Sequence, residues 1–334
     1  MIHSKKIEVF HGQIDKQSIT FIQKNINVVH YSHNPEYLCV VTNFEHKSTP
    51  YYFMIKHQTS YVYYQFIIRE IDSKIFNIQY YDIVAPFDYG EYHNNNTELL
   101  DSFFKTFHAF CLNKNIISEF IRFNPMLTHK VNLLEKHMNI SFIQDHIYMD
   151  LTIDYVSSFS KRKIRNIKKA QKYDYQFIEN DTIENFYLVY VNTMKRIKAN
   201  SYFYFEQSAL KSLLAFGKIF SIKYDDKIIS SIFILEDIDI IYYFLGGTHA
   251  KYIHLGFNSL LFKLVANYYT RSKKMFFLSG GKNGLYTYKQ EFSSLTKPYY
   301  IGKKIYNELI YKQLTIESSR VNNDFFPQYR EKII

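Results

Sequence analysis

The sequence is short of the residues on which several classes of protein depend. It has no tryptophan and only 2 cysteines among 334 residues. Cys39 and Cys111 cannot make a disulfide framework, and neither lies in a Cys-x-x-Cys or metal-ligand spacing. The missing tryptophan, beside abundant Ile, Lys, Asn and Tyr, reflects an AT-rich coding genome rather than a function. Because the two cysteines fit neither a disulfide framework nor a metal site, a reducing, cytoplasmic environment is expected.

Other absences narrow the function. No apolar run approaches the roughly 20 residues that span a bilayer, so no membrane insertion is expected. The first residues, Met-Ile-His-Ser-Lys-Lys-Ile-Glu8, lack the apolar core of a signal peptide. The 13 histidines show neither a His-x-x-x-His nor a His-Glu pair, so no metal is expected. A dinucleotide-binding glycine fingerprint and the Gly-Lys-Ser/Thr end of an NTPase loop are both absent.

The composition is that of a folded chain with a large core. Hydrophobic residues make up 47% of the sequence and aromatic residues 19%, which argues against disorder. The length suits two compact domains, and we place their boundary near Asp150, which gives domains of residues 1–150 and 151–334. No Pro, Gly or Ser-rich linker lies there, so close packing around an interdomain cleft is expected.

The net charge of +10 favours anionic partners without choosing among them. The most basic segment, residues 160–170, carries Ile164, Ile167 and Ala170 among lysines and arginines. This pattern predicts an amphipathic helix with a solvated basic face. The functional alternatives are a nucleic-acid patch and electrostatic guidance of a phosphorylated cofactor or nucleotide.

The stretch from Ile238 to Gly281 carries the clearest local pattern. It predicts a strand over 238–247, a turn at Gly256, an amphipathic helix after it and a strand over 275–279. A helix that begins after a glycine turn presents unpaired backbone N–H groups to a phosphate or pyrophosphate. The structural alternative is that Gly256 is a packing glycine in an ordinary α/β fold.

The same order of elements appears in the first half. A strand is predicted over 74–84, a turn over 85–90, a helix carrying the apolar residues from Leu100 to Cys111, and a strand over 117–123. Strand, turn, helix and strand thus occur twice, which indicates a duplicated unit.

Several motifs resemble one superfamily. Residues 252–261 resemble the pyrophosphate loop of the GNAT acyltransferases, although Ile253 and His254 stand where many members have arginine and glycine. The segments 86–90, 122–125, 160–170, 278–281 and 288–292 resemble Fem-type peptidoglycan aminoacyltransferases and related enzymes of surface-polysaccharide assembly. The resemblance implies an α/β fold of two tandem GNAT-like domains, each a mixed twisted sheet flanked by helices. The first would hold the acceptor and the second acyl-CoA.

The resemblance also implies a site for transfer of an acyl group to an amine, which needs a proton acceptor and an oxyanion donor. The catalytic candidates are Asp88 and His254. Glu236, Asp237, Asp239 and His249 are further acceptors whose alternative roles are hairpin caps or surface residues. The cofactor-binding candidates are Phe244, Leu245, Gly246 and Gly247 for the thioester, and Leu255, Gly256, Phe257, Asn258 and Ser259 for the pyrophosphate. The substrate-binding candidates are Tyr89, Arg122, Asn124, Tyr202, Tyr204 and Lys289.

The function expected from these features is that of an acyl-CoA-dependent N-acyltransferase. Its acceptor would be a nucleotide-linked amino sugar for O-antigen or capsule, whose amine attacks the thioester directly. One alternative is a Fem-type transfer from aminoacyl-tRNA to a peptidoglycan precursor. Another is a catalytically idle GNAT-like binding module. A homodimer remains an open possibility.

Overall fold

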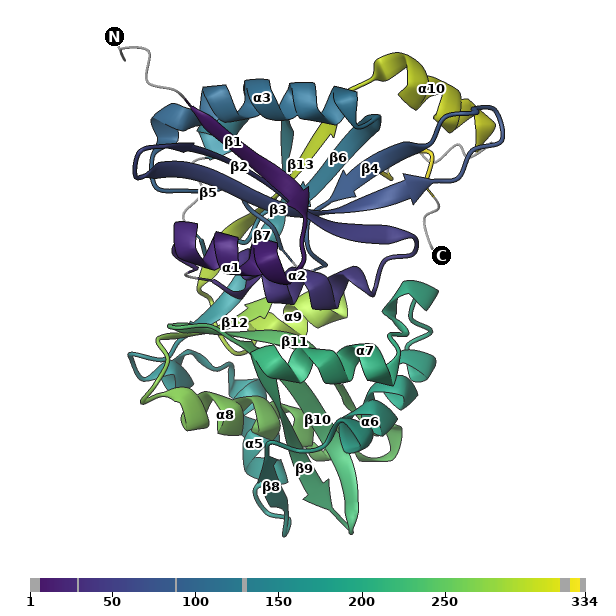
Figure 1. The fold of residues 1–334 in the computed structure, drawn as a ribbon. Helices are drawn as coiled ribbons and strands as arrows, with labels where there is room; N and C mark the ends of the chain where they lie inside the picture. The colour runs from purple at the N-terminus through teal and green to yellow at the C-terminus, as the bar shows by residue number, and fades with distance from the viewer. Residues whose placement is uncertain (1–6, 29, 88, 128–130, 319–324, 331–334) are drawn as a thin grey trace. The chain divides into compact units, whose positions relative to one another are not determined.

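The computed structural model describes residues 7–28, 30–87, 89–127, 131–318 and 325–330 (Figure 1). Its contacts divide the chain into two compact units. Unit 1 comprises Met1–Ile143 and Tyr299–Lys332, and unit 2 comprises Gln144–Pro298 and Ile333–Ile334. Each unit is a mixed sheet flanked by helices, as the sequence predicts. The described residues 299–318 and 325–330, which the sequence analysis assigned to the second domain, belong to unit 1.

The sheet of unit 1 runs in the order β1-β2-β3-β4-β6-β13, with β5 also paired to β3. All these pairs are antiparallel except β4 and β6, which are parallel. The strands are β1 (Glu8–Gln13), β2 (Ser48–His57), β3 (Ser60–Ile71), β4 (Tyr80–Val84), β5 (His93–Asn94), β6 (Ile116–Arg122) and β13 (Thr296–Ile305).

Helices cover both faces of this sheet. The α3 helix lies across one face, and α1 and α2 lie on the other (Figure 1). Phe53 on β2 alternates with Tyr52, so Phe53 meets Phe107 of α3 while Tyr52 meets Phe21 of α1. The helices are α1 (Lys16–Asn25), α2 (Pro35–Thr42), α3 (Leu100–Asn113), α4 (Val131–Leu134) and α10 (Glu308–Glu317), with 3-10 turns η1 (Tyr31–His33) and η2 (Thr97–Leu99).

The predicted strand over 74–84 is wrong in its first half, because β4 begins only at Tyr80. The residues before it bond to α10 instead of to a neighbouring strand. The Ser73 hydroxyl donates to one oxygen of Glu317 at 2.6 Å, and the Lys74 backbone N–H donates to the other at 2.5 Å. Phe76 of this segment packs against the cluster that contains Tyr311 and Leu314 of α10, whereas Ile75 and Ile78 are exposed.

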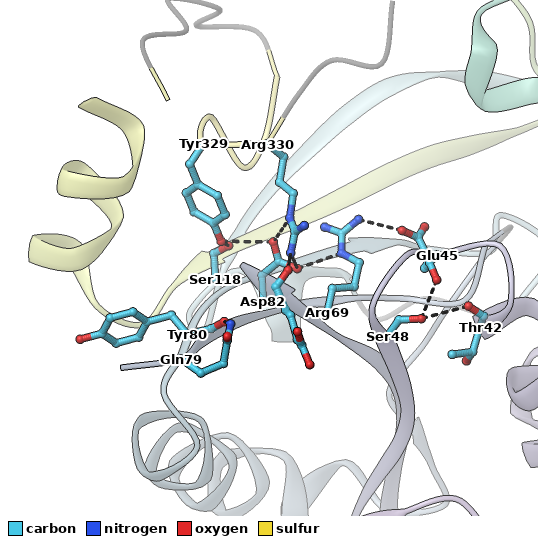
Figure 2. A network of polar contacts seen from close by, with 11 residues as sticks. Thr42, Glu45, Ser48, Arg69, Gln79, Tyr80, Asp82, Ser118, Tyr329 and Arg330 are labelled. Atoms are coloured by element: carbon cyan, nitrogen blue, oxygen red, sulfur yellow. Dashed lines mark hydrogen bonds and ion pairs between the residues drawn. The ribbon is translucent and has the colours of Figure 1, made fainter. Parts of the chain in front are cut away.

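A buried ion network ties Tyr329 and Arg330 to β4 of unit 1 (Figure 2). Asp82 on β4 is fully buried between two guanidinium groups, with Nε of Arg69 and Nε of Arg330 each 2.8 Å from its carboxylate. The Tyr329 hydroxyl donates to the same carboxylate at 3.3 Å. Burial opposes the charge of Asp82, but the two arginines outweigh it and lower its pKa.

The sheet of unit 2 runs in the order β7-β12-β11-β10-β9-β8. Again one pair, β11 and β12, is parallel. The strands are β7 (Asn139–Asp150), β8 (Gln176–Glu179), β9 (Gly217–Tyr224), β10 (Lys227–Glu236), β11 (Ile240–Thr248) and β12 (Met275–Ser279). The β7 residues that pair with β12 are Ile147 to Asp150, which belong to unit 2.

The helices of unit 2 also form two layers. Figure 1 shows α5 and α8 on one side of the sheet and α6 and α7 on the other. Phe186 of α6 packs on Phe233 of β10, whereas Tyr268 and Tyr269 of α8 pack on Phe220 of β9. The helices are α5 (Lys161–Ala170), α6 (Ile183–Arg196), α7 (Gln207–Ser212), α8 (Phe257–Tyr269) and α9 (Gly284–Gln290), with 3-10 turns η3 (Tyr155–Ser158), η4 (Ser201–Phe203), η5 (Leu213–Phe216) and η6 (Ala250–Leu255).

Candidate functional site

The parallel strands β11 and β12 diverge after a short ladder. Their paired residues run from Ile240 opposite Met275 to Tyr242 opposite Phe277. Beyond that point β11 continues to Thr248 alongside β10, while β12 ends at Ser279, whose φ is +66°. The divergence lies where the sequence analysis placed the thioester end of a cofactor.

A β-bulge lies on β11 at this divergence. Tyr243 faces Ile234 on β10 and Leu245 faces Phe233, so Phe244 is the extra residue. A bulge turns the strand and redirects its backbone groups. Residues 243–247 are half-buried, whereas Ile240 to Tyr242 before them are buried. This predicted segment is therefore the accessible end of the strand.

Gly247 has a packing role of its own. A Cβ at this position would lie 2.3 Å from Oγ1 of Thr193 and 2.9 Å from the carbonyl oxygen of Val189, both on α6. Oγ1 of Thr193 also accepts a hydrogen bond of 3.1 Å from the backbone N–H of Thr248. The glycine therefore lets α6 approach the end of β11 closely.

Gly256 combines a left-handed backbone conformation with a close contact. Its φ is +86°, in the left-handed region, and a Cβ there would lie 2.4 Å from the carbonyl oxygen of Asn166 on α5. The Lys169 ammonium, also on α5, donates to the His254 carbonyl at 3.0 Å. The turn before α8 is thus held against α5.

The α8 helix begins without a cap. Gly256 at its N-cap has no side chain to accept a hydrogen bond. Within the described residues, the backbone N–H groups of Phe257, Asn258 and Ser259 have no hydrogen-bond acceptor. The side chains of Ser160, Thr182 and Asn307 each cap one N–H of α5, α6 and α10, whereas α3, α7 and α9 also begin without a side-chain cap. Three unsatisfied donors at the positive end of a helix make a site for an anion.

Beside this helix end lies a buried lysine that the sequence analysis placed on a solvated face. Lys163 of α5 is fully buried, with Nζ 3.3 Å from Glu291 and 3.4 Å from the Ser259 hydroxyl. The ammonium also lies 3.4 Å from the centroid of the Tyr288 ring, a cation–π contact. Burial lowers the pKa of Lys163 to about 8, against the opposing effect of Glu291.

Asn258 and Ser259 take part in this same cluster. The amide of Asn258 donates to the Tyr288 hydroxyl at 3.0 Å, and the Ser259 hydroxyl lies 3.4 Å from the same oxygen. The Ser230 hydroxyl on β10 donates to Oδ1 of Asn258 at 3.4 Å. These contacts link the first turn of α8 to α5, α9 and the sheet.

Lys289 of α9 is buried beside the end of β12. Its ammonium donates to the Gly280 carbonyl and lies 5.2 Å from the centroid of the Tyr243 ring on β11. His146 on β7 lies beside the same glycine, since a Cβ on Gly280 would be 2.5 Å from its Nε2. Burial and then the charge of Lys289 lower the pKa of His146 to about 3. The imidazole is therefore neutral at neutral pH.

The predicted proton acceptors have different surroundings. Asp88 lies outside the described residues. His254 is an exposed residue of η6. The alternative acceptors at 236–239 form the hairpin between β10 and β11, where the Tyr269 hydroxyl donates to Glu236 and Lys274 pairs with Asp239 at 3.0 Å. The side chain of His249 accepts from the Lys251 N–H at 3.3 Å, as a cap of η6.

The predicted acceptor-binding residues of unit 1 are adjacent in the fold. The backbone N–H of Gly90 donates to the Arg122 carbonyl at 2.8 Å, which joins the turn that contains Tyr89 to the end of β6. Tyr89 is buried against Tyr299, and the Arg122 guanidinium lies 4.9 Å from the centroid of the Phe120 ring.

Asn124 has a structural partner. It is fully buried, its Nδ2 lies 2.8 Å from Nε2 of His30, and its Oδ1 accepts from the Met126 N–H at 2.9 Å. In unit 2, Tyr204 is exposed. Tyr202 belongs to η4, and its side chain lies outside the described part of the structure.

No metal was expected from the sequence, yet the described residues contain a cluster of metal-capable side chains. One ligand atom from each of His33, Glu91 and His93 lies within 4.8 Å of the others. These residues are far apart in the sequence and match no short metal motif, so only the fold brings them together. Among the described helices, none is long and apolar enough to cross a membrane.

Comparison with known proteins identifies the fold. A scan against models of protein families finds no match, and neither does a search of curated protein sequences. Among solved structures, FemX aligns over 92% of this chain and 100% of its own, with a TM-score of 0.66 and 11% identity. L-PGS from Bacillus licheniformis aligns over 91% and 96%, with a TM-score of 0.56 and 10% identity.

A tandem GNAT protein from the clavulanic acid biosynthesis pathway aligns over 90% of this chain and 99% of its own, with a TM-score of 0.54 and 7% identity. At such identities the likeness establishes the fold alone. The chain has the tandem GNAT fold shared with FemX, which confirms the fold that the sequence motifs implied.

Proposed function

We propose that this protein is a cytoplasmic, acyl-CoA-dependent N-acyltransferase whose acceptor is a nucleotide-linked amino sugar of surface-polysaccharide synthesis. The observation that carries the proposal is the uncapped start of α8 beside the divergence of β11 and β12. A ligand with a diphosphate and a long, flexible thioester arm matches both features. The amides of Phe257, Asn258 and Ser259 would take the pyrophosphate, and the arm would pass along residues 243–247.

The helix end favours an anion for two reasons. Three backbone donors lack an acceptor in the described residues, and the helix dipole adds about half a positive charge at this end. Because Gly256 has no Cβ, a phosphate can approach the backbone closely.

The reaction follows from the ligand. The amine nitrogen of the acceptor attacks the thioester carbon, the C–N bond forms, the C–S bond breaks, and the thiol of coenzyme A leaves. A backbone donor near the bulge at Phe244 would stabilise the oxyanion, and Lys289 would hold an anionic part of a substrate. Asp88 and His254 remain the candidates for the group that accepts the amine proton. His146 is a weak base, because its pKa is about 3.

The sharpest test is Asn258→Asp. Position 258 is the second residue of α8, where a carboxylate stabilises the helix but repels a bound pyrophosphate. If the introduced carboxylate lies about 6 Å from a pyrophosphate with two negative charges, their repulsion is about 1.4 kcal/mol even at the dielectric constant of water. This corresponds to about a tenfold loss of affinity. Isothermal titration with coenzyme A and acetyl-CoA should show at least this loss, with no fall in thermal stability.

The matched control is Leu309→Asp. Leu309 is exposed and is also the second residue of a helix, α10, so the variant adds the same charge at the same helix position in unit 1. It should leave coenzyme A affinity unchanged. Absence of coenzyme A binding by the unmodified protein would refute the proposal, as would equal effects of the two variants.

The alternative with structural support is transfer from aminoacyl-tRNA to a peptidoglycan precursor. FemX matches over its whole length, and Lys289 lies in the segment that resembles the Fem-type enzymes. An assay with charged tRNA beside acetyl-CoA separates the two donors, because only one of them should yield an acylated amine. Coenzyme A binding without turnover on any amino-sugar acceptor would favour an idle binding module.

A further inference from the structure

A second cluster of chemically capable side chains lies in unit 1, on elements that the proposed acyl transfer does not use. The β5 strand pairs with β3, with His93 opposite Tyr63. Because side chains alternate along an extended chain, Glu91 and His93 point to one side. Tyr92 points to the other, where its hydroxyl donates to the buried Glu119 at 2.6 Å. Glu91 and His93 thereby meet His33 of η1.

His33 is the unusual member. It is 1% exposed, and within the described residues neither of its ring nitrogens has a hydrogen-bond partner. Nε2 of His33 lies 3.5 Å from Oε1 of Glu91, and its ring stacks on that of His93 with centroids 4.2 Å apart. Buried polar groups are nearly always hydrogen-bonded, because an unsatisfied one costs about 1–3 kcal/mol. The geometry therefore indicates a ligand for this nitrogen.

The backbone around His33 is held firmly in place. The side-chain amide of Gln65 donates to the carbonyl of Ser32 at 2.6 Å and to that of Asn34 at 3.2 Å, so both neighbours of His33 are fixed to β3. The Tyr63 hydroxyl in turn donates to Oε1 of Gln65 at 2.8 Å. A preorganised imidazole with a supporting layer of hydrogen bonds is characteristic of metal sites.

The bonds of His93 fix which nitrogen can bind a metal. Nε2 lies 2.9 Å from the carbonyl oxygen of Asn27 and 2.9 Å from the Tyr61 hydroxyl. A carbonyl only accepts, so Nε2 carries the proton and Nδ1 keeps its lone pair. Metal-binding histidines commonly donate the other N–H to a carbonyl in this way.

We propose that His33, Glu91 and His93 form a binding site for a divalent transition metal of the Zn²⁺ type, with a water or a ligand atom in the fourth position. Two imidazoles and one carboxylate suit zinc better than Mg²⁺ or Ca²⁺, which prefer oxygen ligands. Bonds of about 2.1 Å in a tetrahedral site place ligand atoms about 3.4 Å apart. The contact between His33 and Glu91, at 3.5 Å, already has this spacing, and a ligand atom of His93 lies within 4.8 Å of both.

The test uses the purified full chain, stripped with a chelator and titrated with Co²⁺ and Zn²⁺. Co²⁺ should bind with one-to-one stoichiometry and give the intense visible absorption of a four-coordinate site, and Zn²⁺ should displace it. Glu91→Gln, which keeps the shape of the side chain, should weaken Zn²⁺ at least tenfold. Tyr61→Phe, which alters only the second layer around His93, should weaken it up to about tenfold. Zn²⁺ should raise the melting temperature of the unmodified protein, and less so that of Glu91→Gln.

The matched control is His137→Gln. His137 also belongs to unit 1 and lies 2.9 Å from a carboxylate, that of Asp101, but it is outside the cluster. Its removal should leave the Co²⁺ spectrum and the affinity unchanged. The proposal is overturned if the unmodified protein binds no stoichiometric metal, or if Glu91→Gln binds as tightly as it does. The titration is independent of coenzyme A, so its outcome does not depend on the acyltransferase proposal.

Discussion

Replacing Gly256 by alanine tests how tightly the turn before α8 is constrained. The substitution adds a single methyl group at a backbone φ of +86°, directed at the carbonyl oxygen of Asn166. Both partners of the clash are backbone, so neither can rotate away. Either the turn or α5 must move.

The expected loss of stability has two parts. The left-handed conformation disfavours an L-residue by about 1–2 kcal/mol. The contact of 2.4 Å between the new Cβ and the Asn166 oxygen adds an overpacking cost of about 1–3 kcal/mol. The sum, about 2–5 kcal/mol, is a large fraction of the stability of an ordinary domain. Gly256→Val would be worse still, so a loss of coenzyme A binding in that variant would not separate misfolding from a missing phosphate contact.

The assay is urea unfolding followed by circular dichroism, with Gly284→Ala as the matched control. Gly284 begins α9, and a Cβ there would meet no atom within 4 Å. The control should therefore be neutral or slightly stabilising, because alanine restricts the unfolded chain. If Gly256→Ala unfolds at the same urea concentration as the unmodified protein, the packing role assigned to this glycine is refuted.

Two further predictions concern buried titratable groups. Asp82→Asn should destabilise unit 1 by about 3 kcal/mol or more, because Arg69 and Arg330 lose a buried counter-charge. The control is Asp72→Asn, which changes an exposed carboxylate and should leave the urea midpoint unchanged. Because the folded-state pKa of Asp82 is lowered, its contribution to the free energy of unfolding is present above pH 3.8 and is lost as the pH falls through the folded-state pKa. Similar losses of stability in Asp82→Asn and Asp72→Asn would contradict the role of burial. The stability of unit 2 should fall as the pH drops from 6.5 to about 3, because over this range His146 is protonated in the unfolded state but not in the folded state. His146→Gln should make this fall smaller. An unchanged pH profile of unfolding would contradict the prediction.

The repeated local pattern was enough to predict a strand, a helix and a second strand in each half of the chain. The strand, helix and strand expected in each half correspond to β4, α3 and β6 in unit 1 and to β11, α8 and β12 in unit 2. Hydrophobic periodicity and glycine turns are local signals, so they survive without knowledge of the fold. Boundaries were less certain, as β11 begins at Ile240 rather than Ile238.

Long-range pairing was beyond the sequence. Ile301 to Ile305 has the composition of a strand, but nothing local tells that its partner is Arg122 to Ser118 on β6. This pairing, together with the contacts of Tyr329 and Arg330 with Asp82, joins the described residues after Pro298 to unit 1. The cluster of His33, Glu91 and His93 could not be predicted for the same reason. The β5–β3 pairing and the hydrogen bonds of Gln65, which bring the cluster together, join segments that are far apart in the sequence.

The sequence of the basic helix α5 contains a signal for its buried lysine. In α5 the buried residues are Lys163, Ile167 and Ala170, which follow the i, i+4, i+7 spacing of one helix face. Ile164 lies at the edge of this face and is only partly buried. Lys163 stands at the first position of an otherwise apolar face, so its ammonium is buried when the helix packs. A buried ammonium needs a counter-charge or aromatic neighbours. Glu291 and Tyr288 supply these from α9 and the residue after it. The basic run is therefore not simply a solvated surface, because one of its charges ties α5 to the start of α8.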